Sequence, residues 1–179
     1  MKTLISLPVI LSCLLILSSC APKTVPSPVW AYEKEAIELT FQADSQLNQY
    51  NDKPHTLQLC IYQLKDPNGF NQLIESEDGL YRLLECGMFD GTVANYKSLI
   101  VSPGEYRTVM LDRAESARYI GIAAGYANIH KDRITRLLEI PVLTVKEGSL
   151  FRKQKVNRPD TLKTALRLAP HQIETGTGE

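Results

Sequence analysis

Cysteines are the residues of this chain with the widest chemistry, because a thiol can be acylated, oxidised to a disulfide or bound to a metal. The chain has four of them, Cys13, Cys20, Cys60 and Cys86. None has the Cys-x-x-Cys or Cys/His spacing of a metal site, so no metal is expected. Cys13 and Cys20 lie in or beside an apolar N-terminal run, whereas Cys60 and Cys86 lie far downstream. The two pairs therefore need separate explanations.

The first twenty residues have the parts of a secretory signal peptide. A single lysine is followed by an apolar run from Leu4 to Leu17 and then by small residues before Cys20. The run is shorter than the roughly 20 apolar residues that a membrane-spanning helix needs, and Pro8 interrupts it. We therefore expect residues 1–19 to be removed on export, which leaves Cys20 as the first residue of the mature protein.

The cleavage point also predicts a covalent lipid. The sequence Leu17-Ser18-Ser19-Cys20 resembles the lipobox of bacterial lipoproteins. That resemblance implies diacylglyceryl transfer to the Cys20 thiol and acylation of the new amino terminus, with an ordinary signal peptide as the alternative. Each buried methylene contributes about 0.8 kcal/mol, so several chains hold a protein firmly in a membrane. Ala21 stands where inner-membrane lipoproteins of enterobacteria usually carry Asp, which favours the periplasmic face of the outer membrane.

Cys60 and Cys86 are the two cysteines left in the mature domain. An even pair in an oxidising compartment predicts a disulfide, and two separate thiols are the alternative. Cys60 belongs to an expected strand over 57–62, and Cys86 ends an expected helical segment. A disulfide between them would attach that segment to the sheet.

No other residues form a recognisable reactive set. The three histidines, His55, His130 and His171, are scattered, and the chain has neither a Gly-x-Ser-x-Gly elbow nor a P-loop. The Asx-rich tract over 44–52 lacks the spacing of a calcium loop. Twenty basic and twenty acidic residues give no net charge, which argues against nucleic-acid binding. We predict no catalytic residue, no small-molecule substrate and no cofactor beyond the lipid on Cys20.

The elements that carry these residues are mostly short strands. Alternating apolar and polar residues separated by Pro/Gly turns predict an all-β sandwich over residues 35–170. Strands are expected over 36–41, 57–62, 96–101, 106–111, 119–126, 137–145 and 162–168. Helical spacing predicts a two-helix insertion at about 68–86. Small residues in the strand over 119–126 indicate a close packing neighbour.

Three segments fall outside that pattern. Pro22, Pro26 and Pro28 predict an extended tether over 20–34, in which Trp30 and Tyr32 are expected to dock on the domain rather than on the membrane. The basic stretch over 146–160 is interpreted as a solvated loop, with contact to anionic headgroups or an acidic partner as the alternative. Residues 171–179 are expected to form a flexible tail.

Four segments of the domain resemble the TssJ (SciN) family, the outer-membrane lipoproteins of type VI secretion systems. They are Leu47-Asn48, Ile61–Asp66 followed by Phe70, Pro103-Gly104-Glu105, and Tyr119–Tyr126. The resemblance covers roughly residues 36–145. It implies a transthyretin-like β-sandwich with a small helical addition and no enzymatic activity. It also implies that the protein binds the periplasmic C-terminal region of the inner-membrane protein TssM and so anchors the secretion complex to the outer membrane.

The loop between the first two strands, Asp44–Pro54, is the predicted partner-binding surface. In the family this loop contributes to the TssM contact, and long loops on rigid scaffolds often carry binding sites. Leu47 and Tyr50 would form an exposed apolar centre, with the alternative that both fold back on the sandwich. Asn48, Gln49 and Asn51 would form hydrogen bonds around that centre. The competing function is a different periplasmic binding module, such as a lipoprotein inhibitor of an envelope hydrolase.

Overall fold

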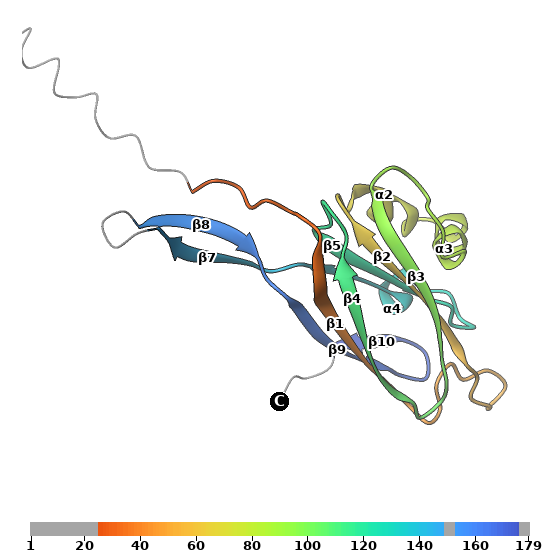
Figure 1. Cartoon of the computed structure of the whole chain (residues 1–179). Coiled ribbons are helices and arrows are strands. Elements are labelled where there is room, and N and C mark those ends of the chain that lie inside the picture. Colours follow the sequence, from red (N-terminus) through yellow and green to blue (C-terminus); the bar gives the residue numbers. More distant parts are fainter. Residues whose placement is uncertain (1–24, 149–152, 176–179) are drawn as a thin grey trace, which may run out of the picture.

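Two four-stranded sheets face each other in the computed structural model, which describes residues 25–148 and 153–175 (Figure 1). The predicted signal peptide and Cys20 lie outside the described residues. The first sheet has the strand order β10-β9-β1-β4 and the second has the order β3-β2-β5-β6. Strand β1 pairs in parallel with β9 and antiparallel with β4. The predicted β-sandwich is therefore confirmed.

The strand bounds are close to those expected from the sequence over most of the domain. The first sheet consists of β1 Glu33–Ala43, β4 Tyr106–Arg113, β9 Leu162–Leu168 and β10 Ile173–Thr175. The second consists of β2 Leu57–Leu64, β3 Val93–Val101, β5 Tyr119–Ala124 and β6 Thr135–Glu139. A further pair, β7 Val142–Glu147 and β8 Gln154–Pro159, forms its own two-stranded sheet.

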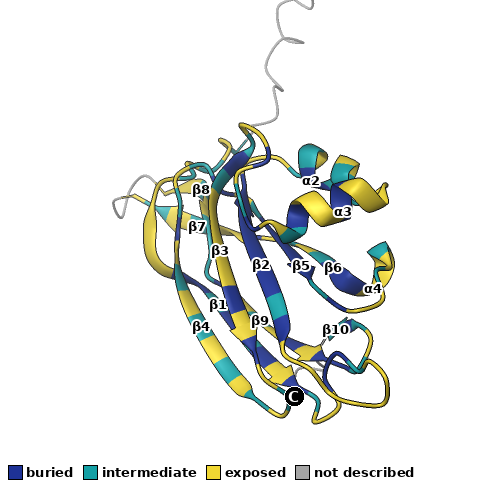
Figure 2. Cartoon of the chain, turned by 90° about the vertical axis from the view of Figure 1, so that its right-hand side faces the viewer, coloured by how far each residue is buried: buried dark blue, intermediate teal, exposed yellow. Residues whose placement is uncertain are grey.

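Strand β2 lies at the centre of the fold because both of its faces are buried (Figure 2). Side chains alternate along a strand, so Leu57, Leu59 and Ile61 face the core between the two sheets. Cys60 and Tyr62 face the opposite way, into a second core beneath the helices. This double burial makes β2 the element that joins the sandwich to the helical insertion.

The helical insertion consists of α2 Asn68–Leu73 and α3 Glu77–Leu84, as predicted. Ser76 caps α3 by accepting a hydrogen bond from the Gly79 amide, at 3.1 Å. Phe70 packs so closely on β5 that a Cβ at Gly121 would lie 2.8 Å from its ring. The small residues expected to admit a neighbour in this strand therefore do so at Gly121.

The C-terminal part differs from the prediction in four ways. The expected strand over 137–145 is two strands, β6 and β7, since Pro141 lies between them and lacks the amide that would continue the ladder. Strands β7 and β8 pair with each other where the sequence indicated a solvated loop over 146–160. The tail prediction is wrong for residues 173–175, because β10 pairs with β9 and Ile173 is fully buried. A short helix, α4 Lys131–Ile134, was not predicted.

The segment before β1 docks on the domain. Trp30 packs against the main core, and its ring lies 5.7 Å from the guanidinium carbon of Arg113. The Tyr32 hydroxyl donates a hydrogen bond to Asp112. Arg113 is buried and pairs with Glu33 at 2.7 Å. The expected docking of Trp30 and Tyr32 is confirmed, so the extended part of the tether is shorter than residues 20–34.

Candidate partner-binding loop

The β1–β2 loop, Asp44–Pro54, leaves the sandwich from a firmly hydrogen-bonded base. The Ala43 amide donates to the Glu105 carbonyl at 2.8 Å, and the Asp44 amide donates to the Leu168 carbonyl at 2.9 Å. The Gly104 amide returns to the Asp44 carbonyl at 3.0 Å. The base is thus bound both to the β3–β4 turn and to the end of β9.

The Asp44 side chain reinforces this base. Its carboxylate accepts a hydrogen bond from the Gln46 amide at 2.8 Å and pairs with the Arg167 guanidinium at 2.8 Å. The Gln46 amide, together with Arg167, holds the pKa of Asp44 below its usual value. Asp44 therefore stays ionised and keeps the start of the loop attached to β9.

Leu47 and Asn48 do not form an exposed contact surface, and for these two residues the partner-binding prediction is wrong. Leu47 is fully buried in the main core. Asn48 is 8% exposed, donates to the Thr56 carbonyl at 2.9 Å and accepts from the Ala127 amide at 2.8 Å. The chain turns inward here because Asn tolerates the positive φ of 49°. These two residues hold the loop in place.

The outer half of the loop is a tight turn. The Tyr50 and Lys53 backbones exchange hydrogen bonds at 2.9 and 3.1 Å, and the residues between them, Asn51 and Asp52, have φ values of 51° and 57°. Positive φ at both central positions is typical of a type I′ turn, which Asn and Asp favour. Tyr50 is 56% exposed, and its ring lies edge-on to His55 at 6.3 Å.

The predicted contact residues therefore divide into two groups. Tyr50 and Asn51 are exposed at the tip, whereas Gln49 is half-buried with its amide bonded to the Pro170 carbonyl. Asp52 and Lys53, which lie in the predicted loop but were not named as contact residues, share the exposed tip with His55, which lies just outside the predicted bounds. The Asn51-Asp52 pair, a known turn signal, could have located this tip from the sequence.

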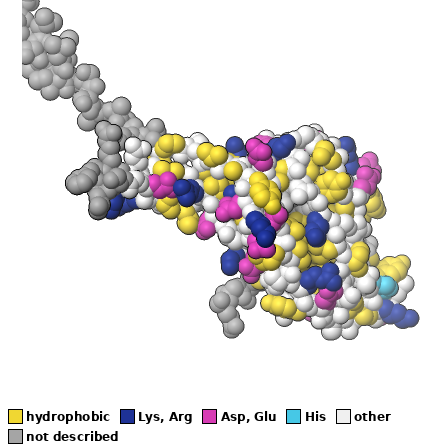
Figure 3. Space-filling model, viewed as in Figure 1, with side chains coloured by type: hydrophobic (Ala, Val, Ile, Leu, Met, Phe, Trp, Pro, Cys, Tyr) yellow, Lys and Arg dark blue, Asp and Glu magenta, His cyan; other side chains and the backbone are white. Residues whose placement is uncertain are grey.

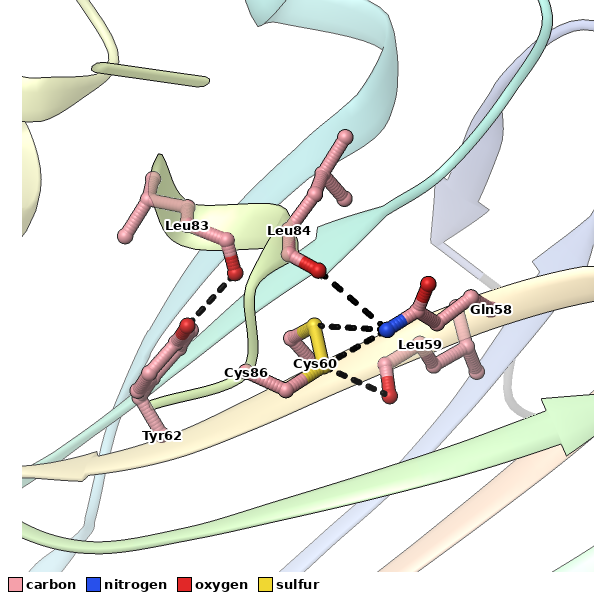
Figure 4. The surroundings of a disulfide bond; sticks show 7 residues. All are labelled: Gln58, Leu59, Cys60, Tyr62, Leu83, Leu84 and Cys86. Carbon is pink, nitrogen blue, oxygen red and sulfur yellow. Dashed lines mark hydrogen bonds between the residues drawn. A yellow bond between two sulfur atoms is a disulfide. The ribbon is translucent and has the colours of Figure 1, made fainter. Parts of the chain in front are cut away.

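The disulfide links Cys60 of β2 to Cys86, two residues after the end of α3 (Figure 4). The Cα atoms of Cys60 and Cys86 lie 5.0 Å apart, within the range a disulfide requires. The Gln58 amide donates to the Leu84 carbonyl at 3.2 Å beside the bond, and the Tyr62 hydroxyl donates to Leu83. Burial raises the pKa of Tyr62 to about 12, so this hydroxyl remains a donor. The geometry meets the requirement of the predicted pairing.

Two other kinds of site are not found in the described part of the chain. No cluster of three or more His, Cys, Asp or Glu side chains among these residues could hold a metal ion. No helix there has the length and apolar content needed to cross a membrane. The loop tip carries an exposed aromatic ring, Tyr50, beside polar neighbours, and this is the chemistry of a recognition surface.

Comparison with known proteins places the domain in a family. Residues 35–167 match the family described as "Type VI secretion lipoprotein, VasD, EvfM, TssJ". No curated protein sequence matches the chain.

Solved structures share the fold at low sequence identity. The Serratia marcescens protein Lip, titled a membrane-bound component of the type VI secretion system, aligns with a TM-score of 0.57 and 18% identity over 80% of this chain and 98% of its own. The lipoprotein TssJ1 from Pseudomonas aeruginosa aligns with a TM-score of 0.54 and 16% identity, over 85% of this chain and 100% of its own. A chain in a structure titled "T6SS protein TssM C-terminal domain (869-1107) from EAEC" aligns at 0.57 and 17%, over 79% and 98%. At identities this low, the structural alignments show a common fold and nothing more.

Proposed function

Because the chain belongs to the type VI secretion lipoprotein family, we propose that it anchors the membrane complex of this secretion system to the outer membrane. The partner in this proposal is the periplasmic region of the inner-membrane protein TssM. Similar folds occur in structures titled for the TssM C-terminal domain and for a type VI membrane complex, which supports this choice. The protein acts as a linker, held by lipid on one side and by a protein contact on the other.

The observation that carries the proposal is the placement of the tether and the loop at opposite ends of β1 (Figure 1). The tether enters β1 at Glu33, and the β1–β2 loop leaves it after Ala43. Eleven residues of strand span about 36 Å. A lipid on Cys20 would therefore hold one end of the sandwich at the membrane while the loop tip points away from it, toward the periplasm.

The loop tip has the chemistry of an interface centre. Tyr50 offers a large rigid ring, and a tyrosine loses little conformational entropy on binding. The turn that carries it is fixed by two backbone hydrogen bonds and by the buried Leu47 and Asn48 beneath it. A pre-organised tip needs little ordering when it binds, which leaves more of the contact energy for affinity.

The test is a binding measurement with Tyr50→Ala. If Tyr50 is a hot spot, the purified Tyr50→Ala lipoprotein should bind the TssM periplasmic region about 2 kcal/mol more weakly than the wild type, which is roughly a 30-fold increase in Kd. Tyr81→Ala is the matched control, since Tyr81 is 52% exposed on α3 and far from the loop in sequence. Equal affinity of both variants would refute the loop as the contact. Affinity purification of the lipoprotein from envelopes is the second measurement. Recovery of an envelope hydrolase instead of TssM there would favour the inhibitor alternative.

The lipid anchor has its own test. Cys20→Ser removes the acylation site, so the variant should no longer sediment with outer membranes after a carbonate wash. Loss of several acyl chains removes essentially all of the anchoring free energy. Normal fractionation and lipid labelling of Cys20→Ser would contradict the assignment.

A further inference from the structure

The proposed function leaves the β7–β8 hairpin without a role. Its two strands pair with each other and with neither sheet of the sandwich, and the hairpin extends beyond the body of the domain (Figure 1). A two-stranded hairpin is only marginally stable by itself in water. A surface that packs against it would therefore add to its stability.

One face of the hairpin carries lysines. The register places Lys146 directly opposite Lys155, and side chains that are paired across strands lie on the same face. Lys153 lies one residue before β8 and adds a third lysine at this end of the hairpin. All three lysines are exposed. Like charges directly opposite each other destabilise a strand pair, so hairpin folding alone does not account for this arrangement.

The acidic residue of the hairpin lies on the other face. Glu147 follows Lys146, so its side chain points the opposite way, and it forms an ion pair with Arg158. Among the residues that the structure describes, no carboxylate pairs with any of the three lysines. The lysine face therefore has uncompensated positive charge, and basic side chains are visible along this projecting part in Figure 3.

The hairpin lies beside the tether. A groove of about 470 Å³ separates the segment around Pro26 and Val29 from Val156–Pro159 of β8. Cys20 precedes Val25, the first described residue, by five positions. A chain of five residues spans at most about 18 Å. A lipid on Cys20 would therefore keep the bilayer surface close to the hairpin.

We propose that the lysine face, Lys146, Lys153 and Lys155, docks on anionic phospholipid headgroups of the membrane that holds the Cys20 lipid. The proposal rests on the acylation of Cys20 proposed above. Each lysine near an anionic surface improves binding about fivefold, and the anchor keeps the lysines at high effective concentration. Three weak contacts then suffice to fix the tilt of the domain, with the β1–β2 loop directed away from the bilayer.

The experiment uses the full acylated lipoprotein in vesicles. Thr144→Cys adds an exposed labelling site on the face of Lys146 and Lys155, and it is the single free thiol of the mature protein once Cys20 is acylated and Cys60 is bonded to Cys86. A fluorophore on this site should be quenched by nitroxide headgroups in vesicles rich in phosphatidylglycerol, and much less in phosphatidylcholine vesicles. Molar salt should reverse the quenching, because the Debye length falls to about 3 Å.

Two charge variants complete the test. Replacing Lys146, Lys153 and Lys155 together with Gln should lower the ratio of docked to undocked protein by about a hundredfold. The matched control replaces three exposed lysines on other strands or loops, Lys65, Lys97 and Lys163, with Gln. Equal quenching in both variants, or in both vesicle types, would overturn the proposal.

Two further outcomes separate the possible causes of failure. A chain that does not float with the vesicles would overturn both the acylation and the docking. A chain that floats but is quenched in neither vesicle type would overturn the docking alone. A change in the fluorescence of the label that occurs only when the TssM region is added would assign the lysine face to an acidic protein instead.

Discussion

The β1–β2 loop and the β7–β8 hairpin both project from the sandwich, but they are held in opposite ways. The loop is bonded at its base to the β3–β4 turn and to the end of β9, and its Leu47 is part of the main core. The hairpin pairs only with itself, and its exposed residues include Val142 and Leu143. The loop shares the stability of the whole domain, whereas the hairpin depends on its own ladder.

This difference matches the two surfaces that we assign to them. A specific protein partner is bound most economically by a tip that is already in one conformation. A membrane is a broad charged surface, so a projecting hairpin with several exposed lysines is suited to it. Local stability therefore distinguishes the two regions, and four predictions test or refine this comparison.

Leu47→Ala should have the largest effect on folding. Truncation of a fully buried leucine leaves a cavity and lowers the free energy of unfolding by about 2–5 kcal/mol. Val145→Ala, in the half-buried part of the hairpin, should lower it by less than about 1 kcal/mol. Urea denaturation measures both values. If the two variants unfold alike, the loop is no more firmly held than the hairpin.

Loss of the disulfide should have the next largest effect on the free energy of unfolding. The bond closes a loop with a sequence separation of 26, for which the chain-entropy model gives about 3.5 kcal/mol. Replacing Cys60 and Cys86 with Ser should therefore destabilise the domain without changing the affinity of the loop for TssM. Thermal unfolding and the binding assay measure the two effects. Detection of two reactive thiols in the non-reduced protein would contradict the pairing itself.

Acidification should loosen the base of the loop. The pKa of Asp44 is lowered from 3.8 in the folded state, so its contribution to stability is present above that pH and is lost as the pH falls through the folded value. Asp44→Asn should therefore melt below the wild type at neutral pH and approach it in strong acid. Melting curves at both pH values test this, and the difference should be small because Arg167 is half exposed.

Lys146→Glu should have the smallest effect and the opposite sign. A glutamate opposite Lys155 replaces repulsion with attraction and should stabilise the hairpin by about 0.2–1 kcal/mol. Hydrogen exchange of the β7 and β8 amides should slow accordingly in the detergent-solubilised protein. Faster exchange would show that the Lys146–Lys155 pair is not strained. The same variant should dock less on anionic vesicles.

The local sequence determined a large part of this architecture. Alternation placed β2, β4 and β9 within a few residues of their observed bounds, and helical spacing located α2 and α3. These features depend on the side-chain period and on turn residues, which are properties of short segments. The lipobox-like ending at Cys20 is also a property of a short segment, and the even number of cysteines in the mature domain is found by counting them.

The tertiary structure decided which apolar residues of the loop are exposed. Leu47 and Tyr50 have similar polar neighbours in the sequence, yet Leu47 lies in the core and Tyr50 at the tip. The reason is contact with distant elements, since Asn48 bonds to Ala127 and Gln49 bonds to Pro170. Strand β10 likewise forms because β9 offers it an edge. Burial depends on partners far along the chain, and a short segment does not specify them.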